Sequence, residues 1–170
     1  MDPTIRPALV ADTAAIGTVQ VRAWQAAYRG AMPDAYLDGL DPAQRAAMWV
    51  DLLRREDDTR RLVVAEAHGS VVGFAAFGPA RDDPVDGELY ALNVDPDEWG
   101  QGHGPRLLRE ATTWLGAAGY AEAVLFVVVQ NERARRMYEA DGWALDGPEI
   151  VADALGVSVP EVRYRRALPS

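Results

Sequence analysis

The apolar residues in the first third of the chain recur mostly at helical spacing. Residues 4–9 form a short, β-prone stretch that predicts a first strand, and Asp12 after it is a typical helix N-cap residue. Four apolar residues then lie three or four positions apart and predict a helix: Ile16, Val19, Ala23 and Ala27. The polar, glycine- and proline-containing residues 29–34 break this helix.

Two further helical segments come before the first strand pair. A short piece over residues 36–40 is followed by Asp41-Pro42, which caps a third helix running to about Arg55. Proline is tolerated there because the first helical residue needs no amide donor. A hairpin closed by a tight turn at His68-Gly69-Ser70 is predicted from two strands, over residues 61–67 and 71–77.

The second half of the chain alternates strands with helices. A strand over residues 88–94 follows a polar loop, and Gly102-His103-Gly104 leads into a helix that closes near Gly119. The apolar face of that helix consists of Leu107, Leu108, Ala111 and Leu115. Residues 123–129 are continuously apolar, as expected for a central strand covered on both faces. Asn131 caps a last helix, and closing strands are predicted over residues 143–145 and 162–167.

This order of elements predicts an α/β fold with a mixed sheet of the α+β type. Helices alternate with strands, so they should cover both faces of one central sheet. The 170 residues suit one domain over residues 1–170, because the chain shows no repeat, linker or low-complexity tract.

Composition removes several classes of function. The formal net charge of −9 leaves no basic surplus for nucleic-acid binding; it indicates either simple solubility or an attraction for cationic partners. The absence of cysteine excludes disulfides, thiolate metal sites and a cysteine nucleophile. No apolar run is long enough for a membrane span, and the first residues do not resemble a signal peptide, so we expect a cytoplasmic protein.

The polar residues also exclude common catalytic centres. Only two histidines occur, His68 in a predicted turn and His103 in a glycine-rich loop, and no histidine or carboxylate cluster has zinc-ligand spacing. None of the three serines lies in G-x-S-x-G. The glycine loop matches neither the P-loop, which needs a lysine, nor the G-x-G-x-x-G dinucleotide pattern.

The glycine loop nevertheless suits an anion. Gly100, Gly102 and Gly104 let the backbone approach a phosphate closely, and the amides and dipole of the following helix favour negative charge. A plain strand-to-helix connection would account for the same glycines, so the flanking residues decide between the two interpretations.

Two separated motifs resemble those of the GNAT acetyltransferase superfamily. The first is the strand Glu88-Leu-Tyr-Ala-Leu-Asn-Val94 followed by Gly100-Gln-Gly-His-Gly104. The second is the segment from Asn131 through Ala134 and Tyr138 to Gly142-Trp143. The N-terminal Trp24-to-Gly30 segment is similar to a bacterial subgroup of undefined substrate.

The resemblance implies the acyl-CoA N-acyltransferase fold and acetyl-CoA as cosubstrate, with no metal. The residues that it assigns to acetyl-CoA are Leu92, Asn93, Val94, Gly100, Gln101, Gly102, His103, Gly104, Arg106 and Asn131. Asn131 could equally serve only as an N-cap, and Arg106 only as a solvated helix residue. Trp99 stands where the family usually has Gln or Arg, and Pro105 removes one amide that could face a phosphate, so the phosphate contacts are left open.

The catalytic roles follow from the same resemblance. Tyr138 matches a tyrosine that protonates the leaving thiolate, with core packing as the alternative. Glu88 matches a general-base glutamate and should share a strand face with Tyr90 and Leu92; a solvated strand end and a water chain as base are its alternatives. Trp24 and Tyr28 lie one helical turn apart and either wall an acceptor pocket or pack in the core.

The expected function is therefore acetyl transfer from acetyl-CoA to an amine of a small molecule or peptide. Without a cysteine, direct attack in a ternary complex is the simplest route. The alternative is a non-enzymatic acyl-CoA-binding or sensing module of the same fold. The sequence leaves the acceptor, the pathway and pairing into a homodimer open.

Overall fold

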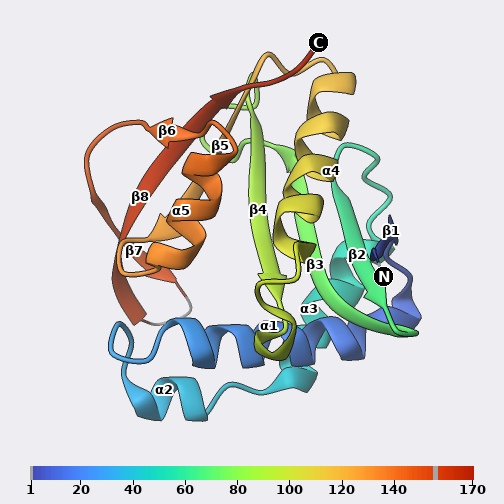
Figure 1. The fold of residues 1–170 in the computed structure, drawn as a ribbon, viewed down its shortest axis with the longest axis vertical. Helices are drawn as coiled ribbons and strands as arrows, with labels where there is room; N and C mark the ends of the chain where they lie inside the picture. The colour runs from blue at the N-terminus through green and yellow to red at the C-terminus, as the bar shows by residue number, and fades with distance from the viewer. Residues whose placement is uncertain (1, 155–156) are drawn as a thin grey trace.

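A computed structural model describes residues 2–154 and 157–170 (Figure 1). Its strands form one sheet in the order β1-β2-β3-β4-β5-β8-β6, with β7 also paired to β8. Among the strands of the described residues, only β4 and β5 pair in parallel, so the sheet is mixed as predicted. The strands are β1 (Thr4–Pro7), β2 (Arg61–Ala67), β3 (Ser70–Pro79), β4 (Gly87–Val94), β5 (Glu122–Val128), β6 (Ala144–Leu145), β7 (Ile150–Ala154) and β8 (Val157–Ala167).

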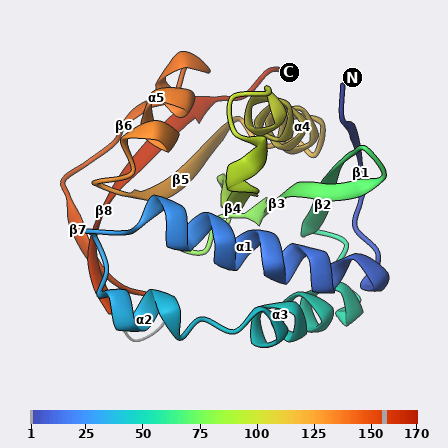
Figure 2. The same cartoon turned by 60° about the horizontal axis from the view of Figure 1, so that its bottom comes forward.

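Helices cover both faces of this sheet, which confirms the predicted layering. Figure 2 shows α1 (Thr13–Ala27), α2 (Asp34–Asp38) and α3 (Pro42–Arg54) on one face. On the other face lie α4 (His103–Ala117) and α5 (Glu132–Ala140). Short 3₁₀ turns precede α1 and α4, over Val10–Asp12 and Pro96–Glu98. No helix in the described part of the chain is long and apolar enough to cross a membrane.

Two of the three predicted N-caps are confirmed. The Asp41 side chain accepts a hydrogen bond from the Ala43 amide at 2.9 Å, and Asn131 accepts one from Ala134 at 3.2 Å. Asp12 does stand at the N-cap position of α1, but its side chain accepts no hydrogen bond from that helix. Its carboxylate accepts the Leu9 amide at 2.7 Å and also binds Arg6, because the 3₁₀ turn carries the chain into α1 without a free cap position.

The predicted apolar stripe of α4 forms the centre of the larger core. Leu107, Leu108, Ala111 and Leu115 are all buried against β3, β4 and β5. On the opposite face, Ile16 and Val19 of α1 pack on β2 and β3 with Phe74. The sheet is thus packed on both faces. Space for a ligand can arise where two neighbouring strands separate.

β4 has two irregularities: a bulge in its pairing with β3 and a short pairing with β5. The register between β3 and β4 shifts at Ala76/Phe77, which leaves Tyr90 as an extra residue in β4. Leu92 consequently packs on the α4 side and Tyr90 on the α3 side, so the predicted face shared by Glu88, Tyr90 and Leu92 is wrong for Leu92. The parallel pairing of β4 with β5 covers only residues 87–89 and 123–125, and beyond it the two strands separate.

The C-terminal strands differ from the prediction. β8 begins at Val157, five residues before the predicted start, and β7 was not predicted. Pro160 explains the difference, since a proline inside a run argues against a strand. It is tolerated because its carbonyl accepts the Val129 amide at 3.0 Å, while Val151 of β7 lies opposite it.

Candidate active site

A cavity of about 620 Å³ opens where β4 and β5 separate. Its walls come from the C-terminal end of α1, the end of β4, the glycine loop with the start of α4, and α5 with the residues before it. On α1 the wall consists of Ala23, Ala26, Ala27 and Tyr28, so three small side chains leave room for a ligand beside the sheet. The cavity joins both motifs that the sequence analysis singled out.

Glycine is required at the three loop positions for different structural reasons. Gly100 and Gly102 have φ values of 79° and 85°, in the left-handed region that favours glycine. A Cβ atom at either position would meet no atom within 4 Å, so both backbones face open space. Gly104 is helical, and a Cβ there would lie 2.9 Å from Met137 Sδ. Gly104 therefore permits close packing of α4 on α5.

The start of α4 offers hydrogen-bond donors without partners. The His103 ring is buried, and its Nε2 lies 3.2 Å from Glu98 Oε2. Its Nδ1 is buried and has no hydrogen-bond partner in the described residues. The His103 and Gly104 amides are first-turn groups that a helix leaves unbonded, whereas Pro105 has none to offer. These donors, together with the open backbone at Gly100 and Gly102, fit a pyrophosphate group.

Trp99 and Arg133 form the outer wall of the cavity. The Trp99 indole Nε1 donates to the Val94 carbonyl at 2.9 Å, which fixes the ring at the end of β4. The guanidinium of Arg133, from the first turn of α5, lies over that ring. Arg133 is the one arginine among the described cavity-lining residues. No local sequence pattern indicates Arg133, because the fold alone brings it close to the glycine loop.

Most of the predicted acetyl-CoA residues lie together in this cavity. Eight of the ten line it: Leu92, Asn93, Val94, Gly100, Gly102, His103, Gly104 and Asn131. Gln101 and Arg106 are not among the lining residues. Arg106 instead forms an ion pair with Asp2 at 2.6 Å, which resembles its predicted alternative as a surface helix residue.

Tyr138 closes the inner end of the cavity. Its side chain is only 6% exposed, and its ring centroid lies 6.3 Å from those of Trp143 and Tyr164. Burial raises the pKa of the Tyr138 hydroxyl well above its ordinary value, so the group remains protonated at neutral pH. The geometry places a proton donor at the cavity wall; its catalytic use remains a prediction.

The two predicted acceptor residues are separated by the structure. Tyr28 lines the cavity, and burial raises the pKa of its hydroxyl to about 12, with Asn131 and Glu161 nearby. Trp24 is outside the cavity lining. Its ring packs edge-on against Tyr28 at 5.4 Å, with the Arg45 guanidinium 5.2 Å from the ring, so Trp24 supports Tyr28 from behind.

Glu88 lies outside the cavity lining, and both oxygens of its carboxylate accept hydrogen bonds. The side chain is 1% exposed. One oxygen accepts the Arg81 amide at 2.9 Å, and the other binds the Arg81 guanidinium at 3.0 and 2.5 Å. These bonds hold the carboxylate against Arg81, and the general-base role of Glu88 stays a prediction.

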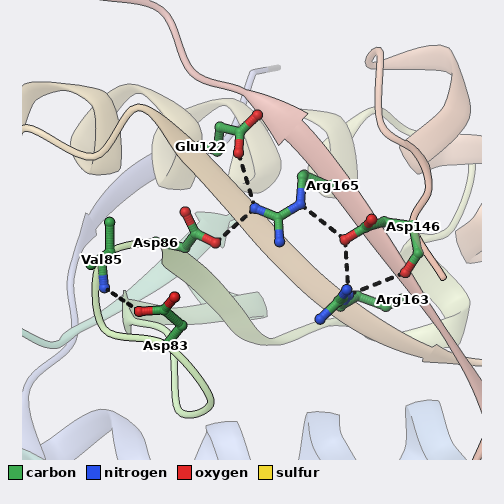
Figure 3. Close-up of polar contacts among 7 residues, drawn as sticks. All are labelled: Asp83, Val85, Asp86, Glu122, Asp146, Arg163 and Arg165. Carbon is green, nitrogen blue, oxygen red and sulfur yellow. Dashed lines mark hydrogen bonds and ion pairs between the residues drawn. The ribbon is translucent and has the colours of Figure 1, made fainter.

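Charged residues also follow one side of β8. Figure 3 shows Arg165 between Asp86, Glu122 and Asp146, with Arg163 beside Asp146. These contacts join β8 to the loop before β4, to the start of β5 and to the end of β6. Within residues 2–154 and 157–170, no group of three histidine or carboxylate side chains is placed to hold a metal ion.

Comparisons with known proteins agree with this geometry. The model of the acetyltransferase (GNAT) family matches residues 20–143. The uncharacterized N-acetyltransferase YuaI of Bacillus subtilis is 32% identical, over 94% of this chain and 90% of its own. The probable N-acetyltransferase Rv2775 of Mycobacterium tuberculosis is 30% identical, over 95% and 91%. The fold matches the PaiA N-acetyltransferase of Thermoplasma acidophilum, solved with coenzyme A, with a TM-score of 0.77 at 20% identity, over 98% and 99%.

Proposed function

The chain belongs to the acetyltransferase (GNAT) family, and from that premise we propose that an amine attacks acetyl-CoA directly in the cavity between β4 and β5. The protein is an acetyl-CoA-dependent N-acetyltransferase of the acyltransferase class. One observation carries the mechanism: a single cavity has the unbonded first-turn amides of α4 at one wall and a protonated tyrosine at another.

The anionic end of acetyl-CoA would bind at the glycine loop. The pyrophosphate would accept hydrogen bonds from the His103 and Gly104 amides in the first turn of α4. Arg133 would add a positive charge from α5, in place of the Gln or Arg that the family usually has at the position of Trp99. The pantetheine arm would run along β4 from Val94 to Leu92, on the edge that faces β5. The pairing with β5 has already ended there, and Asn131 lines the cavity as well.

Tyr138 is the proposed proton donor for the leaving thiolate. A thiolate expelled into a partly dry cavity is costly unless it receives a proton or a strong hydrogen bond. The raised pKa of Tyr138 keeps the proton available until sulfur carries the charge. No cysteine is present in the chain to form an acetyl-thioester with the protein, so the amine nitrogen would form its bond to the acetyl carbon directly.

The acceptor would be a primary amine of a small molecule or peptide, held beside Tyr28. Tyr28 is the aromatic residue of α1 that reaches the cavity, and its high pKa keeps it a hydrogen-bond donor. A cytoplasmic location and pairing into a homodimer belong to the same proposal; cell fractionation and light scattering test them.

The proposal is tested with purified protein, acetyl-CoA and a panel of primary amines. The expected result is amine-dependent release of free thiol, with the acetamide product identified by mass spectrometry. Free CoA should compete with acetyl-CoA, whereas ATP and NAD should not. Tight binding of acetyl-CoA without thiol release from any amine would instead favour the sensing module.

A further inference from the structure

Glu161 lies on the side of β8 that faces α1 and α2. Side chains alternate along a strand, and Val162 and Tyr164 belong to the core beneath α4 and α5. Val159 points the other way, into the apolar cluster of Met32 and Leu37 against which Tyr28 packs. Glu161 follows Val159 on that same face, so its side chain is directed toward the region of Tyr28.

The strand register brings Glu161 next to the cavity wall. It pairs with Val128, the last residue of β5, and the adjoining Val129 amide donates to the Pro160 carbonyl at 3.0 Å. The next two residues along the chain, Gln130 and Asn131, line the cavity. Glu161 thus lies near Tyr28, just outside the cavity lining, at the point where β5 ends.

The Glu161 carboxylate is half-buried but not occupied. Among the described residues, no hydrogen bond or ion pair holds its side chain, in contrast to Glu88. Burial raises the pKa of Glu161, and the Arg81 guanidinium partly opposes that rise. Its own charge contributes to the raised pKa of Tyr28.

The other groups around Glu161 leave it as the available base on this face. Val128 of β5 and Ile150 of β7 lie opposite it in the sheet and are neutral. Arg163, the next residue on its face of β8, is held by Asp146 at 2.9 Å. Arg81, from the loop before β4, is the charged group that acts on Glu161, and Glu161 in turn acts on Tyr28, the C-cap residue of α1.

The acceptor would approach from this face. Residues of α4 and α5 line the other side of the cavity, where the proposed acetyl-CoA site lies. An amine entering past α1 and α2 would meet Glu161 and Tyr28 before the thioester.

We propose that Glu161 is the general base that removes a proton from the acceptor's ammonium group, an inference that rests on the proposed amine acetylation. Loss of that proton frees the nitrogen lone pair, which forms the bond to the acetyl carbon while the carbon–sulfur bond breaks. The sulfur takes the Tyr138 proton. The second nitrogen proton restores Tyr138 through water, and Glu161 releases its proton to solvent, so one ammonium yields one amide, one free thiol and one proton.

The test compares two probe amines with wild-type protein, Glu161→Gln and Glu161→Asp. Butylamine is protonated at neutral pH and needs a base, whereas trifluoroethylamine is already neutral. Glu161→Gln should lower kcat/KM for butylamine by about a hundredfold. The same substitution should change kcat/KM for trifluoroethylamine by less than about threefold, since that probe needs no deprotonation before attack. Glu161→Asp should restore part of the loss with butylamine.

The pH profile and a matched control complete the test. Wild-type kcat/KM for butylamine should rise with pH through the raised pKa of Glu161, and the Gln variant should lose that limb. Glu149→Gln, an exposed carboxylate beside β7, should match wild type. Equal losses with both probes, or wild-type behaviour of Glu161→Gln, overturn the inference. Wild-type protein that releases thiol with neither probe nor any panel amine contradicts the proposed function itself.

Discussion

The guanidinium carbon of Arg133 lies 4.1 Å from the centroid of the Trp99 ring. A cation held over an indole face at this distance is attracted by the ring and keeps its hydrogen-bond donors free at the edge. Trp99 is itself anchored to Val94 at the end of β4. The pair therefore presents a positioned positive charge at the mouth of the cavity, although the glycine loop contributes no arginine to the cavity lining.

Replacing Arg133 should weaken acetyl-CoA binding. Arg133→Met keeps a long side chain on Trp99 and removes the charge, so the dissociation constant should rise about tenfold, or ~1.4 kcal/mol. Salt screens exposed charges, so this difference should shrink at high ionic strength. Calorimetry at two salt concentrations measures both effects. The control is Arg136→Met, whose exposed guanidinium pairs with Glu132; an equal loss there would mean that bulk charge, not position, is responsible.

A methyl group in the glycine loop should affect binding more than folding. Gly102→Ala places a Cβ at a φ of 85° and should cost roughly 1–2 kcal/mol of stability. Gly69→Ala, at a φ of 76° in the turn between β2 and β3, should cost about the same. Only the Gly102 variant should also lose acetyl-CoA affinity, by tenfold or more. Equal affinities for the two variants would place the phosphates elsewhere.

Removing the Tyr138 hydroxyl should reduce catalysis and leave packing intact. We expect Tyr138→Phe to lower kcat by about 10²–10⁴-fold with little change in acetyl-CoA affinity. Tyr164→Phe is the matched control, because that buried hydroxyl donates to Glu139 at 2.7 Å and accepts from Arg135 at 3.0 Å. It should lose about 1–2 kcal/mol of stability and keep kcat. A near-normal kcat for Tyr138→Phe would mean that Tyr138 only packs in the core and does not donate the proton.

The ion network on β8 should stabilise the fold in a pH-dependent way. Bonds from Arg165 lower the pKa of Asp146 below its usual value. A lowered carboxyl pKa contributes stability that is present above the unfolded value of about 3.9 and is lost as pH falls through the folded value. Asp146→Asn should therefore cost about 0.5–1 kcal/mol at neutral pH and nothing in strong acid. Thermal melts from neutral to acid pH test this, with the exposed Asp51→Asn as control.

The elements that sequence predicted well are those with local causes. The stripe of Leu107, Leu108, Ala111 and Leu115 and the caps at Asp41 and Asn131 depend only on neighbours along the chain. The family resemblance added the eight cavity residues that local patterns alone could not bring together.

The errors come from contacts between distant segments. The bulge at Tyr90 moves Leu92 to the other face of the sheet, and no pattern within β4 reveals it. The place of Arg133 in the cavity lining and of Glu161 beside it depends on the β4–β5 opening and on the register of β8. Residues that reach the site only through contacts between distant segments could therefore not be predicted from local sequence patterns.

The three residue pairs that join β4 to β5 also divide the molecule into two complementary fragments. A cut in the loop after α4, near Gly119, would separate β1–β4 with α1–α4 from β5–β8 with α5. The fragments would meet through that short ladder, the core beneath α4 and α5, and the apolar cluster under α1 and α2. Because acetyl-CoA would touch both pieces, its binding energy would add to their reassociation. A split version of this enzyme would then report acetyl-CoA concentration by complementation.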